Sequence, residues 1–249
     1  MKKMFLILRR DYEEMRSTAA FRIMIIVAAF ITIAASVGIS VALRLQSWYG
    51  VQETVSLLDM IIGLVLYFLP FIILMIFVWA FASIQITKEK ANGNIECLMA
   101  TPIEPETLWV GKCIAVFAPA FLITVIASFI AVSVINLAAI QPGWGVFILP
   151  SAALVSGLIV NPLLFFAILG FIVLFSLASN PDIAAAPSLL IGFGLMIGMP
   201  VGLMTGTIDI SSWSFTLWYT FGTALAWLIV LGLTRMLTRQ NIVLSSKGS

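Results

Sequence analysis

Residues 88–112, KEKANGNIECLMATPIEPETLWVGK, form the longest polar interval between two very hydrophobic segments of the chain. The interval carries seven charged side chains. Gly93 completes an Asn-Gly turn signal, and a short amphipathic helix is predicted after it, over residues 95–100. Residues 101–104 have the spacing of a capping box, and Pro105 stands where a first helical turn tolerates proline. The interval is therefore predicted to form two short amphipathic helices at a membrane surface.

The composition around this interval is that of a polytopic membrane protein. Of 249 residues, 62% are hydrophobic and only 10% are charged. Soluble domains contain about 25% charged residues. We therefore expect an all-α protein that crosses a membrane several times.

The apolar runs predict six membrane-spanning helices, each close to or above the roughly 20 residues needed to cross a hydrocarbon core. They lie at about 23–43, 60–86, 113–137, 158–177, 183–203 and 215–237. The boundaries within 138–162 are open, because Pro150 and Asn161-Pro162 interrupt a run too long for one upright helix. A short interfacial or re-entrant piece is predicted near residues 146–156.

Residues 1–22 are predicted to form an amphipathic interfacial helix along the inner leaflet. Phe5, Leu8, Tyr12 and Met15 recur at steps of three and four residues, with charged side chains between them. This spacing places the four apolar side chains on one helical face. The alternative is an ordinary charged tail before the first span.

The distribution of positive charge predicts the orientation. With the amino terminus inside, twelve of the thirteen Lys and Arg residues fall in cytoplasmic segments, and only Arg44 falls outside. Cytoplasmic loops of membrane proteins are enriched in Lys and Arg. We therefore expect a multi-pass protein of the cell membrane with both termini cytoplasmic.

Several functional classes are disfavoured by the residues available. The chain has no histidine, and Cys97 and Cys113 lack the number and spacing of a metal site. No ionisable residue lies near the middle of a predicted span, whereas proton- and ion-coupled carriers usually need one there. The net charge of +2 does not favour a nucleic-acid partner. We expect a chain that is not itself an enzyme.

The polar interval also carries an ordered motif. Its residues are Glu89, Gly93, Asn94, Ile95, Glu96, Leu98, Met99, Thr101, Pro102, Gly111 and Lys112. This motif resembles the cytoplasmic loop of ABC type-2 transporter permeases, which typically read E-x-x-x-G-T-L-E-x-L-L-x-T-P and later G-K. Asn94 replaces the usual Thr, and Met99 replaces the second Leu. The motif covers about a tenth of the chain, and the flanking topology extends the likeness to nearly all of it.

The resemblance implies that residues 1–249 form a single ABC type-2 transmembrane domain, with residues 87–112 as its cytoplasmic coupling loop. It implies a separate ABC ATPase subunit, which holds ATP and Mg, and no cofactor in this chain. It further implies a second permease copy or a paralogue, and export of a substrate. Gly111-Lys112 is not the end of a P-loop, because Glu106 and Cys113 stand where Gly and Ser or Thr are needed.

Five residues inside the predicted spans are candidates for a substrate path. They are Tyr67, Phe71, Asn161, Gly194 and Gly198. The simpler interpretation is that the aromatic side chains face lipid or other helices and that the glycines allow close helix packing. Two functions of other classes remain open, a non-transporting membrane assembly factor and an ATP-independent carrier or channel.

Overall fold

The computed structural model describes residues 2–82, 95, 100, 103–178 and 181–246, and no strand occurs among them. Their elements are α1 (Lys2–Ser17), α2 (Ala19–Arg44), η1 (Gln52–Thr54), α3 (Val55–Phe81), α6 (Pro105–Ile135), η2 (Asn136–Ile140), α7 (Gln141–Trp144), α8 (Ser151–Val155), η3 (Ser156–Val160), α9 (Asn161–Ala178), α10 (Pro181–Met204), α11 (Trp213–Leu233), η4 (Thr234–Met236) and α12 (Arg239–Ser246). Segments η2 and η3 are π-helical turns that continue directly from the α-helix before them.

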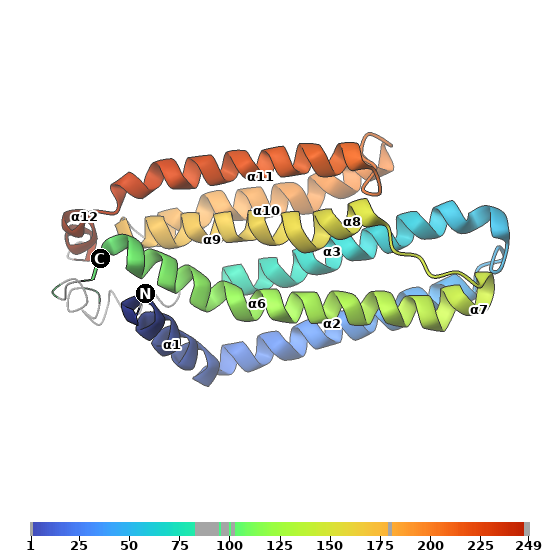
Figure 1. Cartoon of the computed structure of the whole chain (residues 1–249), viewed down its shortest axis with the longest axis horizontal. Helices are drawn as coiled ribbons and strands as arrows, with labels where there is room; N and C mark the ends of the chain where they lie inside the picture. The colour runs from blue at the N-terminus through green and yellow to red at the C-terminus, as the bar shows by residue number, and fades with distance from the viewer. Residues whose placement is uncertain (1, 83–94, 96–99, 101–102, 179–180, 247–249) are drawn as a thin grey trace.

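The long helices lie side by side in one elongated bundle, and α1 crosses it at a slant (Figure 1). Five described segments are long and apolar enough to cross a membrane. They are Ala19–Arg44, Gln52–Phe81, Pro105–Trp144, Ser151–Ala178 and Trp213–Met236. Helix α10 has 24 residues, and its described apolar part is Leu190–Met204. The all-α, polytopic prediction is therefore confirmed, while a sixth span stays a prediction.

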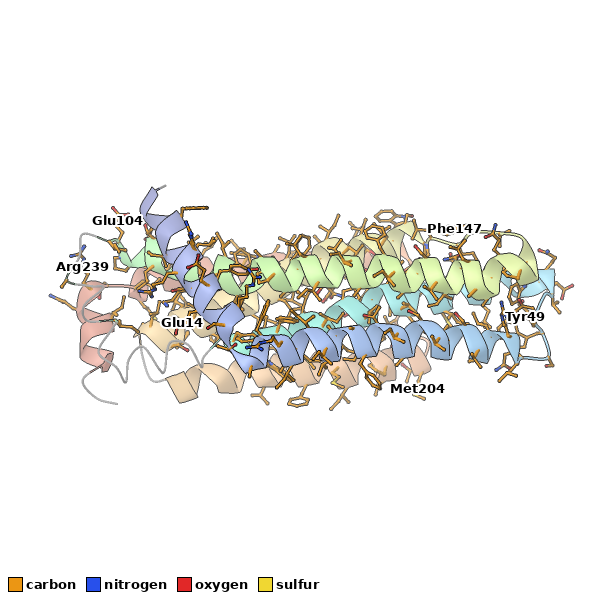
Figure 2. All side chains as sticks on the ribbon, turned by 90° about the horizontal axis from the view of Figure 1, so that it is seen from below. Glu14, Tyr49, Glu104, Phe147, Met204 and Arg239 are labelled. Carbon is orange, nitrogen blue, oxygen red and sulfur yellow. The ribbon has the colours of Figure 1, made fainter. Side chains whose placement is uncertain are left out.

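Helices α1 and α12 lie at one end of the bundle, which we call the α12 end, and α7 lies at the other, the α7 end (Figure 1). Glu104 and Arg239 are both at the α12 end, and Tyr49 and Phe147 are at the α7 end (Figure 2). Arg239 donates a hydrogen bond from Nη2 to the carbonyl of Ile103 at 3.1 Å. This hydrogen bond therefore holds the residues just before α6 against α12.

Helices α3 and α9 form the centre of the bundle. In their most apolar 18-residue windows, 72% and 67% of residues are buried, against 22% in α2 and 17% in α11. Aromatic rings fill much of this core, and Phe71 meets Phe165 edge to face with ring centroids 5.1 Å apart. The outer faces of α2 and α11 are apolar and exposed, as expected for helices that contact lipid.

The backbones of α3 and η3 meet at Gly157. A methyl group added there would lie 1.8 Å from the carbonyl oxygen of Leu66. Pro70 has no N–H to donate to that carbonyl four residues earlier, so the Leu66 oxygen is left facing the neighbouring segment. Only glycine permits an approach this close.

Three predicted boundaries differ from the structure. The helix predicted over 1–22 ends at Ser17, because Thr18 caps a new helix by accepting a hydrogen bond from the backbone N–H of Phe21 at 3.2 Å. The helix of the third predicted span begins at Pro105 rather than at residue 113, so the second short helix predicted in the polar interval is wrong: those residues are the first turns of α6. The charge of Lys112 suggested the later start, but this side chain is buried in an ion pair.

The third difference concerns residues 146–156. The prediction of a short interfacial or re-entrant piece there is wrong. Residues 146–150 have no helical structure, and Ser151 begins a helical segment that runs unbroken to Ala178. Pro162 does not break it, because the wider π-helical turn η3 precedes the proline and accommodates the missing N–H.

The α7 end is held by hydrogen bonds to the π-helical turn η2. Arg44 donates from Nε to the carbonyl of Ala138 at 2.8 Å, and the Tyr49 hydroxyl donates to the carbonyl of Ala139 at 3.0 Å. Asn136 binds both backbone groups of Ile148. These contacts fasten the α2–α3 connection and the 145–150 segment to the end of α6.

Candidate functional site

Most residues of the predicted coupling motif lie outside the described part of the chain. These are Glu89, Gly93, Asn94, Glu96, Leu98, Met99, Thr101 and Pro102. Of the remaining motif positions, Ile95 is fully buried, and Gly111 and Lys112 are buried in the second turn of α6. The coupling role of all these residues stays a prediction.

Lys112 is joined to Asp11 of α1, 101 positions earlier in the chain. The Lys112 ammonium donates to Asp11 Oδ2 at 3.2 Å, and the two side chains are only 3% and 2% exposed. The other carboxylate oxygen accepts hydrogen bonds from Arg10, at 3.0 Å from Nη2 and 3.2 Å from Nε. Removing one partner of such a buried pair is strongly destabilising. The pair therefore fixes α1 against the start of α6.

The buried face of α1 contains Ile7, Asp11 and Met15, which follow one another at intervals of four residues. This face shares Met15 with the predicted apolar face, but it is turned toward Asp11 and leaves Phe5 62% exposed. Sequence reasoning missed Asp11 for that reason. The signal was present, since Asp11 stands midway between two apolar residues at helical spacing.

The opposite side of α1 carries an exposed ion pair. Arg9 donates from Nε to Glu13 at 2.8 Å, and the hydrogen bond and the negative charge of Glu13 together raise the pKa of Arg9. Exposed pairs of this kind contribute little to stability. The position of α1 therefore depends on its buried face and on Asp11.

A second group of candidates meets in the centre of the bundle. Asn161 donates from Nδ2 to the carbonyl of Tyr67 at 2.9 Å, and its Oδ1 accepts a hydrogen bond from the Tyr219 hydroxyl. One side chain thus connects α3, α9 and α11. Sequence reasoning missed Tyr219, whose partner lies 58 positions away.

The predicted path residues Tyr67 and Phe71 stack beside this connection, with ring centroids 6.1 Å apart. Both side chains are fully buried, as is Asn161. The hydroxyl of Tyr67 has no hydrogen-bond partner among the described residues. The three residues are therefore brought together as one packed cluster.

Gly194 and Gly198 do not join this cluster. Both lie on an exposed face of α10, and a methyl group added at either would meet no atom within 4 Å. Phe193, Ile197 and Val201 are exposed beside them. This face is open to lipid or to another protein chain.

The described residues contain no group of three or more His, Cys, Asp or Glu side chains that could hold a metal ion. Comparison of the chain with protein-family models, with curated proteins and with solved structures found no match.

Proposed function

We propose that this chain is the membrane-spanning permease subunit of an ATP-driven ABC type-2 exporter. It crosses the cell membrane six times with both termini cytoplasmic, and it forms the substrate path with a second copy or a paralogue. ATP and Mg belong to a separate ATPase subunit. The motif between Glu89 and Lys112 supports this proposal, and so does the position of α1 and α12 at the same end of the bundle (Figure 1).

The observation that carries the proposal is the buried pair of Lys112 and Asp11. Lys112 closes the polar interval, and its partner belongs to α1. Helix α6, which contains Lys112, is 31 residues long, about 46 Å at 1.5 Å per residue. A displacement at the cytoplasmic interval would therefore move α1 together with the start of α6, and α6 would carry the displacement across the bilayer.

The central cluster is the second part of the proposed mechanism. Asn161 holds α3, α9 and α11 together in this conformation. Movement of α6 would be passed to α3 and α9, because both pack against it. Breaking the hydrogen bonds of Asn161 would open a path beside Tyr67 and Phe71.

The test is transport and ATP hydrolysis in proteoliposomes that contain the chain and the ATPase that co-purifies with it. Gly93→Val and Glu96→Ala are expected to preserve membrane insertion and to abolish or uncouple transport. Glu53→Ala, at the α7 end, is the matched control. Transport without any ATPase would indicate a carrier or channel instead. If the unmodified chain transports nothing and the two variants leave the ATP hydrolysis of the partner unchanged, the chain is an assembly factor instead.

Orientation is tested separately with single cysteines in a variant that lacks Cys97 and Cys113. Cysteines at Ser47 and Ser212 are expected to react with an impermeant thiol reagent added to intact cells, whereas a cysteine at Ser17 or Ser245 is not. Labelling of Ser17→Cys from outside would overturn the proposed topology.

A further inference from the structure

A groove of about 330 Å³ runs between α2 and α6 on the outside of the bundle. Alanine and isoleucine side chains from both helices make up most of its lining. The small lining residues include Ala28, Ala29 and Ala127, and the branched ones include Ile25, Ile126 and Ile130. Figure 2 shows α2 and α6 side by side on this face, with α1 crossing them toward the α12 end.

The groove offers apolar surface along its length. Its one hydroxyl-bearing lining residue, Thr32, donates to the carbonyl of Ala28 within its own helix at 2.7 Å. Ile126 is 59% exposed. Both bordering helices belong to segments able to cross a membrane, so the groove faces the hydrocarbon region of the bilayer.

Positive charge lies at the α12 end of the groove. Arg22 precedes Ile25 by three residues and Ala29 by seven, which places all three on one face of α2. Arg16 lies in the last turn of α1, on the other side of the α1–α2 junction. Both arginines are exposed, and neither is paired with an acid among the described residues.

The acids nearest in sequence do not neutralise these arginines. Glu13 is occupied by Arg9. Glu14 is exposed and stands two positions before Arg16, about 200° around the helix from it. The two arginines therefore present positive charge beside the end of an apolar groove.

We propose that the α2–α6 groove with Arg16 and Arg22 binds one anionic phospholipid of the cytoplasmic leaflet. An acyl chain lies along Ala28, Ala29 and Ala127, and the phosphate binds the two guanidinium groups. Arginine matches phosphate geometry with paired N–H donors. The inference uses the orientation given under the proposed function, with the α12 end in the cytoplasm, and it does not depend on ATP-driven transport.

The experiment is native mass spectrometry of the full chain released from nanodiscs that contain equal amounts of phosphatidylglycerol and phosphatidylcholine. The unmodified chain is expected to retain one phosphatidylglycerol in preference to phosphatidylcholine. Arg22→Gln is expected to reduce this preference about fivefold, since one basic residue near the surface contributes about 1 kcal/mol. Arg235→Gln is the control, because Arg235 is also exposed but lies in η4, outside the groove.

The groove itself is tested with Ala29→Phe, which fills it. This change is expected to remove the retained lipid, whereas Ala224→Phe on the exposed face of α11 is expected to preserve it. Equal retention of the two lipids by the unmodified chain would overturn the proposal, as would an equal effect of Arg22→Gln and Arg235→Gln. Dissociation of a dimer by Ala29→Phe, without loss of lipid, would show that a second copy occupies the groove. Since the lipid count does not involve ATP, none of these failures would bear on the proposed ATPase coupling.

Discussion

Gly157 gives the most direct test of how the centre of the bundle is packed. In the variant Gly157→Ala, the added methyl carbon would lie 1.8 Å from the Leu66 oxygen and 2.7 Å from the Leu66 carbonyl carbon. Real contacts of a Cβ atom essentially never fall below 3.0 Å, so the two backbones would have to separate by at least 1.2 Å. Because the obstructing atoms are backbone and not the end of a flexible side chain, α3 and the segment before α9 would have to shift as units.

The expected cost follows from this displacement. Overpacking a well-packed core usually costs about 1–3 kcal/mol, and a backbone clash belongs at the upper end of that range. A loss of about 3 kcal/mol lowers the melting temperature by roughly 6–12 °C for a chain of this size. The same substitution in an open helical position acts the other way, since Ala is favoured over Gly in a helix by roughly 0.5–1 kcal/mol.

The assay is thermal unfolding of the purified variant in detergent, followed by the fraction of protein that remains monodisperse after heating. Gly222→Ala on α11 is the matched control, because a methyl group there would meet no atom within 4 Å. The control is expected to melt at or slightly above the temperature of the unmodified chain. If Gly157→Ala and Gly222→Ala melt at the same temperature, α3 and η3 do not approach as closely as described.

Two further predictions concern the ends of the bundle. Asp11→Asn removes a charged partner at 3.2 Å from the buried Lys112 ammonium, and it is expected to lower the free energy of unfolding by about 3 kcal/mol. The double variant with Lys112→Gln is expected to recover part of that loss. If the two losses measured by thermal unfolding are fully additive, the two side chains do not form a pair. Arg44→Gln weakens the contact with the Ala138 carbonyl. Since a hydrogen bond from a charged group contributes about 1.5–3 kcal/mol, hydrogen exchange of the backbone amides in η2 is expected to become at least tenfold faster. Unchanged exchange in η2 would refute the role of Arg44.

Much of the architecture is predictable from the sequence. Long apolar runs bounded by polar residues predict the long helices, because an unpaired backbone group inside a bilayer costs several kcal/mol and helices satisfy those groups locally. Pro105 likewise predicts the start of a helix at the correct residue. In each case the controlling interactions are between residues a few positions apart, so the order of residues is sufficient.

The candidate site is only partly predictable. Tyr67, Phe71 and Asn161 lie in helices long and apolar enough to cross a membrane, as expected, but their contact in one cluster depends on Tyr219 and on the approach of α9 to α3. Gly194 and Gly198 carry the same small-residue signal as other helix-packing positions, yet they lie on an exposed face. A spacing of four residues identifies a helical face and does not identify what that face meets.

The amino-acid sequence by itself determined that the chain is helical, that most of it is suited to a membrane, and where its positive charges concentrate. Only the tertiary structure decided that Lys112 is paired with Asp11, that Gly157 is pressed against Leu66, and that the helix beginning at Ser151 passes Pro162 without a break. The physical reason is the distance along the sequence between the residues that interact. The helical pattern of apolar residues and backbone hydrogen bonds depends on near neighbours in the chain. The effect of a buried charge or of a missing side chain depends on atoms far away in the sequence, 101 positions for Lys112 and Asp11, which only packing brings close.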